Sequence, residues 1–171
     1  MEHDPNAKPD DQASKNRLVT IELEESSFSN PSPDIEHERK VAIFDLLEQN
    51  EFSVVDESKT AEGPFHLTLS IADNRLVLDI ADHQERQCAV FGLSMSPFRR
   101  IVKDYFMICD SYFQAIKTAT PSQIEAIDMG RRGLHNEGAS ILSDRLAGRI
   151  ETDSDTARRL FTVICALQFR G

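Results

Sequence analysis

The sequence has no tryptophan, two tyrosines and three cysteines among its 171 residues. It also lacks any run of eighteen apolar residues, which excludes a membrane-spanning helix. Its first residues lack the basic and then apolar layout of a secretory signal peptide, so no export signal is expected. The cysteines form no CxxC pair, and neither they nor the five histidines show the spacing of zinc ligands. We therefore expect no metal and no other cofactor.

The three cysteines each lie within an apolar segment, in QCAVF, FMICDSYF and FTVICAL. An odd number of cysteines without metal-ligand spacing is typical of free thiols in a reducing compartment, which predicts a cytoplasmic protein. Burial among apolar neighbours disfavours the thiolate, so Cys88, Cys109 and Cys165 are predicted to be unreactive.

The excess of negative charge is concentrated near the N-terminus. Nineteen Lys and Arg against 29 Asp and Glu give a net charge of −10, and residues 1–62 account for all of it with 16 acids and 6 bases. A protein that binds duplex DNA normally carries a clear basic excess, so bulk binding to duplex DNA is not expected. The remainder of the chain has balanced charge, which leaves room for a local anion site in the C-terminal half.

The pattern of the first half predicts a sheet. Residues 1–16 are polar and include two prolines, which predicts a disordered N-terminal tail ahead of one domain over residues 17–171. Alternation of apolar and polar residues then predicts strands, which are expected at residues 17–25, 52–56, 65–72, 75–82 and 87–95. A short Asp-Asn turn joins the third of these strands to the fourth. The last three strands are therefore expected to form an antiparallel meander.

Helical periodicity dominates the second half. Apolar residues at helical spacing predict helices, which are expected at residues 33–50, 96–118, from 121 to about 147, and 156–169. Most strands precede most helices, so the pattern predicts a single α+β domain. In it, a group of C-terminal helices covers one face of an antiparallel sheet.

Three Arg-Arg dipeptides, at residues 99–100, 131–132 and 158–159, are candidates for an anion site. Two of them lie near predicted helix starts, where backbone N–H groups and the helix dipole favour phosphate or carboxylate. Ordinary ion pairs on a helix surface are the alternative explanation, because the second arginine of each dipeptide has an aspartate four residues away. These pairs are Arg100 with Asp104, Arg132 with Asp128, and Arg159 with Asp155.

The segment GRRGLHNEGAS, residues 130–140, leaves two alternatives open. In a continuous helix its glycines each need a packing or functional reason, and Arg131 and Arg145 fall on the apolar face, where they need partners such as Glu137. A break at Gly130–Gly133 would instead make a loop. That loop would present Arg131, Arg132, His135, Asn136 and Glu137.

These features favour a non-catalytic binding or regulatory module with an arginine-rich site in its C-terminal helices. The candidate ligand-binding residues are Arg99, Arg131, Arg132, His135, Asn136, Glu137 and Arg158. The expected partner is a protein with an acidic surface or a small anionic ligand, and a homodimer is compatible with the pattern. The main alternative is an enzyme for a phosphorylated or acyl substrate that uses His135 and Glu137 with an arginine clamp. A third hypothesis is an interaction protein whose helical surface docks a partner or a second copy.

Several segments of the sequence resemble the signature blocks of the uncharacterised alphaproteobacterial family UPF0262. They are HERKVAIFDLLEQN, NRLVLDI, TARRLFTVICALQFRG and a long block that begins SPFRRIVKDYF and ends GRRGLHNEG. The resemblance extends over about residues 17–171. It implies a cytoplasmic bacterial protein and carries over no catalytic or binding residues to this chain.

Overall fold

The computed structural model describes residues 15–24, 27–28, 33–55 and 61–167. The strands are β1 (Leu18–Leu23), β2 (Phe52–Val54), β3 (Phe65–Ala72), β4 (Arg75–Ala81), β5 (Gln87–Ser94) and β6 (Ile150–Thr152). The helices are α2 (Pro33–Glu48), the 3-10 turn η2 (Ser96–Phe98), α3 (Arg99–Thr118), α4 (Pro121–Leu146) and α5 (Ser154–Leu167). Among the helices in this part of the chain, none is both long and apolar enough to cross a membrane.

The predicted α+β fold and its meander are confirmed. Strands β3, β4 and β5 pair antiparallel in succession, and the turn between β3 and β4 has positive φ at Asp73 (51°) and Asn74 (59°), as a tight hairpin requires. Strand β1 adds to β3 in parallel, so the four-stranded sheet is mixed, in the order β1-β3-β4-β5. A parallel neighbour needs a crossover connection, and α2 lies in the connection from β1 to β3.

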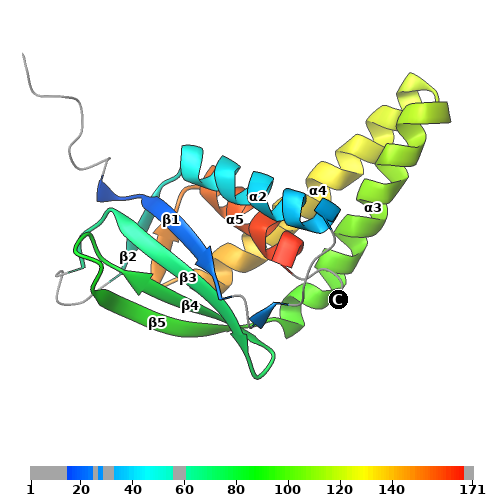
Figure 1. The fold of residues 1–171 in the computed structure, drawn as a ribbon. Coiled ribbons are helices and arrows are strands. Elements are labelled where there is room, and N and C mark those ends of the chain that lie inside the picture. Colours follow the sequence, from blue (N-terminus) through cyan, green and yellow to red (C-terminus); the bar gives the residue numbers. More distant parts are fainter. Residues whose placement is uncertain (1–14, 25–26, 29–32, 56–60, 168–171) are drawn as a thin grey trace, which may run out of the picture.

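One face of this sheet forms the core, because apolar side chains alternate onto it from every long strand. The contributing residues are Leu67 and Leu69 on β3, Leu76, Leu78 and Ile80 on β4, and Phe91 and Leu93 on β5. Helices α2 and α5 pack on each other over the sheet (Figure 1). Nearly every side chain of α5 from residue 160 onward is buried, so α5 is the centre of the helical layer. We call the sheet with α2 and α5 the body.

Helices α3 and α4 form an antiparallel hairpin whose far end projects beyond the body (Figure 1). The turn between them is closed by a capping box: the Gln123 backbone N–H donates to the Thr120 hydroxyl (3.3 Å), and the Thr120 N–H donates to the Gln123 side chain (3.1 Å). At its base, the hairpin begins as the turn η2, and α3 proper starts at Arg99. We call residues 106–132, which include the projecting end, the arm.

Of the two alternatives for residues 130–140, the continuous helix is the one that forms. Helix α4 runs without a break from Pro121 to Leu146. A Cβ at Gly130 would lie 2.7 Å from Ile108 of α3, and a Cβ at Gly138 would lie 2.2 Å from the Phe161 ring of α5. These two glycines therefore allow close approach between helices. No loop interrupts the segment to present the candidate residues together.

The predicted tail lies mostly outside the described residues, as do the last two residues of the predicted final helix. Residues 15 and 16 of the predicted tail are described, and both contact later parts of the chain. Lys15 pairs with Glu62 at 2.8 Å, and the Asn16 carbonyl accepts from the Phe52 N–H at 2.9 Å. Contacts of the domain therefore begin two residues before position 17.

Candidate functional site

Arg131 lies at the contact between the two helices of the arm. Its guanidinium stacks 4.2 Å from the centre of the Tyr112 ring on α3, and its Nη2 atom lies 2.6 Å from Oδ1 of Asp128. Arg132 reaches the other oxygen of the same carboxylate at 3.0 Å. The partners that a buried-face arginine needs are therefore Tyr112 and Asp128, and not Glu137, which is exposed.

His135, one turn further along α4, joins that helix to α5. Its Nε2 atom lies 3.0 Å from the carbonyl oxygen of Arg158 and 2.8 Å from the hydroxyl of Thr162. A carbonyl oxygen can only accept, so Nε2 carries the proton and donates to Arg158. Burial lowers the pKa of His135, and the positive charges of Arg158 and Arg131 add to that effect.

The His135 ring belongs to an aromatic cluster formed by α3, α4 and α5. It stacks on Tyr105 with the ring centres 5.5 Å apart, and it lies 5.7 Å from Phe161. Tyr105 meets Phe161 edge to face at 5.9 Å. Burial raises the pKa of Tyr105 well above its usual range, so the phenol stays protonated. The cluster is a packed junction of three helices.

All three cysteines are free. Cys165 is buried, whereas Cys109 and Cys88 are half-buried, so the predicted burial holds for Cys165 and only in part for the other two. Burial raises the pKa of the Cys109 and Cys165 thiols, which keeps both protonated at neutral pH.

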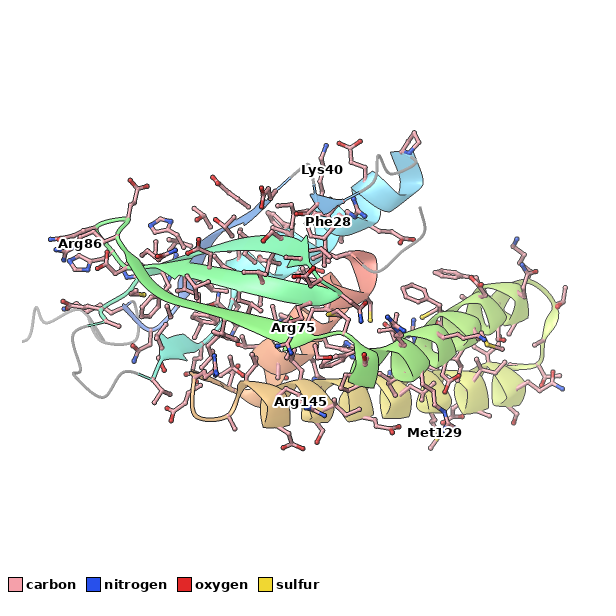
Figure 2. All side chains as sticks on the ribbon, turned by 90° about the horizontal axis from the view of Figure 1, so that it is seen from below. Phe28, Lys40, Arg75, Arg86, Met129 and Arg145 are labelled. Carbon is pink, nitrogen blue, oxygen red and sulfur yellow. The ribbon has the colours of Figure 1, made fainter. Side chains whose placement is uncertain are left out.

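The remaining candidate arginines have partners of their own. Arg99 donates to the side chain of Asn74 in the β3–β4 turn at 2.8 Å. Arg158 forms an ion pair with Asp155. The predicted pair of Arg159 with Asp155 is wrong: Arg159 instead donates to the carbonyl of Gln49 at 2.9 Å, because its side chain turns toward the residue that follows the end of α2. Arg145, predicted on the apolar face, is exposed on α4 (Figure 2).

The structure brings some candidates together and separates others. Arg131, Arg132 and His135 occupy successive turns of α4, and His135 contacts the backbone of Arg158. Arg99 begins α3 thirteen residues before the ring on which Arg131 stacks, which corresponds to about 20 Å along the helix. Asn136 and Glu137 are exposed, and residues one or two positions apart do not face each other on a helix. The side chains of His135 and Glu137, which act together in the enzyme hypothesis, therefore do not face each other.

Two surface recesses lie elsewhere. One is lined by Asn16, Glu51, Phe52, Ser53, Glu151, Thr152 and Asp153, and the other by Asp45, Glu48, Gln49 and Arg159. Neither includes any of the seven candidate residues. Within the described residues, no group of three or more His, Cys, Asp or Glu side chains is placed to hold a metal ion.

The arm carries an apolar stripe, none of whose residues is among the seven candidate ligand-binding residues. Val102, Phe106, Cys109, Phe113 and Ile116 follow the alternating three- and four-residue spacing of a helix-pairing stripe. Val102, at the base, is buried, but Phe113 is 61% exposed and Ile116 is 52% exposed. The spacing is readable from the sequence as an apolar helix face. What the sequence does not reveal is that the far half of this face lies beyond the body.

The environment of His135 predicts a pH dependence of stability. The pKa of His135 in the folded protein is lower than the ordinary value of 6.5, so the unfolded chain binds a proton more readily. Its contribution to stability is therefore complete above about pH 6.5 and is lost as the pH falls through the folded pKa. We expect the difference in unfolding free energy between the wild type and His135→Gln to shrink from pH 8 to about pH 5. Urea unfolding at several pH values measures this, and a difference that does not change with pH would contradict it.

Comparison with known proteins identifies the family. Residues 15–170 match the model of the uncharacterised protein family UPF0262. A UPF0262 protein of Rhodospirillum rubrum is 58% identical over 154 residues, which is 90% of this chain and 93% of the relative. Relatives from Ruegeria pomeroyi and Brucella canis are each 57% identical, covering 91% of this chain and 98% and 95% of their own lengths. No solved structure matches. The chain therefore belongs to the UPF0262 family, in agreement with the resemblance of its sequence blocks.

Proposed function

We propose that the protein is a non-catalytic, cytoplasmic binding module that docks a protein partner through its arm. The observation that carries this proposal is the exposed half of the α3 stripe, at Phe113 and Ile116. Large apolar side chains that lie in line on a projecting helix favour a binding surface over a structural role. The three free cysteines support the reducing cytoplasm as the compartment.

The stripe has the form of a surface for helix packing. At its base it is covered by the body, where Val102 is buried and Phe106 packs against the core. The same row of side chains continues outward at the same spacing but without a covering element from the described residues. A partner helix laid along the arm would continue the cover that the body gives the base of the stripe, and Phe113 would be its aromatic anchor.

The arginines contribute less to this proposal than the apolar stripe. Arg131 and Arg132 share the carboxylate of Asp128, so binding an external anion would require at least one of them to leave that ion pair. The arginine-rich anion site stays a prediction. The geometry favours the third hypothesis of the sequence analysis, in which a helical surface docks a partner.

The docking function is tested by affinity purification with paired variants. Phe113→Glu places a charge in the exposed stripe, whereas Phe44→Glu places the same charge on an equally exposed phenylalanine of α2 (65% exposed). Because both side chains are mostly exposed, both variants are expected to fold, which thermal unfolding verifies. We expect Phe113→Glu to reduce the amount of co-purifying partner at least about tenfold, whereas Phe44→Glu retains it. Equal retention by the two variants would contradict the proposal.

A further inference from the structure

We propose that the partner bound by the arm is a second copy of this chain, an inference that rests on the docking function. In this pairing, two arms pack antiparallel about a two-fold axis, with Phe113 of each copy opposite Ile116 of the other. Such a contact is isologous, since the same surface serves both copies, and it closes after two subunits.

The body limits how far the two arms can overlap. Val102 is buried, Phe106 packs against the core and Cys109, one turn further along, is half-buried, so the body covers the stripe up to about this level. An antiparallel arm that reached further toward the base would meet the body. The register with Phe113 opposite Ile116 places the tip of the second arm, at residues 119–120, at the level of Cys109. It is therefore the deepest overlap that the body permits.

In this register, opposite charges beside the stripe come together. Asp110 and Lys117 are both exposed and lie seven residues apart, which places them on the same flank of the stripe. When Phe113 faces Ile116 of the second copy, Asp110 comes beside Lys117 of that copy, and the two-fold axis repeats the pair. Opposite charges at such flanking positions select partner and orientation in helix pairs.

The net charge of the arm also permits self-association. The chain carries −10 in total, but residues 106–132 contain three acidic and three basic side chains and are neutral. Two arms can therefore approach without mutual repulsion, while the acidic bodies stay at opposite ends of the pair. A partner recognised mainly by charge would require an arm with an excess of one sign.

The size of the contact sets its strength. The overlap extends from residue 109 to the end of α3 at Thr118, about 15 Å of helix. Such a contact buries less than the roughly 1,200–2,000 Å² of a standard interface, so the dimer is expected to be weak and to depend on concentration.

Sedimentation equilibrium of the purified full chain tests the pairing. From about 10 μM to about 1 mM, we expect the average mass to rise from 19.3 kDa toward twice that value. Phe113→Glu is expected to weaken association at least tenfold. Met107→Glu, at an equally exposed position (60%) off the stripe, should leave it unchanged. A mass of 19.3 kDa at every concentration, or loss of association only in Met107→Glu, would overturn the proposal.

A charge exchange tests the register and the identity of the partner. Lys117→Glu places an acid beside Asp110 of the second copy and is expected to weaken association severalfold. Adding Asp110→Lys to the same chain restores the opposite charges, and association should return. Failure of the double variant to recover would overturn this register. A monomeric wild type overturns self-pairing alone, whereas the docking function fails separately if Phe113→Glu and Phe44→Glu retain the same partners.

Discussion

Replacement of Phe161 by alanine is expected to lower the free energy of unfolding by about 3–5 kcal/mol. The ring is fully buried (0% exposed), and it contacts Tyr105 of α3 and His135 of α4. Its removal would leave a cavity where three helices meet and would also remove two aromatic contacts. For a domain of this size, the loss corresponds to a melting temperature lower by about 6–20 °C.

Urea unfolding followed by circular dichroism measures this effect, with Phe113→Ala as the matched control. Phe113 is a phenylalanine on the same helical assembly, but it is mostly exposed, so its truncation should change stability by no more than about 0.5 kcal/mol. If the two truncations lowered the free energy of unfolding equally, the three-helix junction at Phe161 would not be a main source of the protein's stability.

Gly138→Ala is expected to destabilise the protein by about 1–3 kcal/mol. A Cβ at this position would lie 2.2 Å from the Phe161 ring, so either the ring or α4 must move. Ordinarily, glycine to alanine in a helix interior stabilises by up to about 1 kcal/mol, because alanine is the better helix former. The steric overlap therefore reverses the usual sign.

The control for this change lies one and a half turns earlier on the same helix. A Cβ at Gly133 would have no atom within 4 Å, so Gly133→Ala should stabilise the protein by up to about 1 kcal/mol. Thermal unfolding of the two variants should show melting temperatures that move in opposite directions. Shifts of the same sign would show that α4 and α5 do not approach closely at Gly138.

Much of the fold could be predicted because its signals are local. The alternation of β3 to β5 places one face on the core, and that face is the buried one in the structure. The apolar period of α5 predicts a buried face, and the structure buries that face together with most of the rest of the helix. Strand β6 could not be predicted, because three residues between two helices carry no usable period. It forms by pairing with β2, which lies about a hundred residues earlier. The parallel position of β1 likewise depends on a distant strand.

The candidate site was predictable only in part, for the same reason. Arg131 is recognisable as unusual because it falls on an apolar helix face, and His135 lies in the same glycine-rich segment. Their partners are distant in sequence: Tyr112 is nineteen residues away from Arg131, and Thr162 is 27 residues away from His135. Helical spacing alone did not identify the partner of Asp155. The pair forms with Arg158, three residues away, and not with Arg159, four residues away.

Photocrosslinking at residue 113 tests most directly whether another protein chain contacts the arm inside cells. Phe113 is replaced by a photoreactive phenylalanine derivative, and Phe44 carries the same group in a parallel strain, because both side chains are mostly exposed. After illumination, we expect a discrete crosslinked product from position 113, of twice 19.3 kDa for a second copy, and little or none from position 44. No product at position 113, or the same products at both positions, would contradict a docking role for the arm.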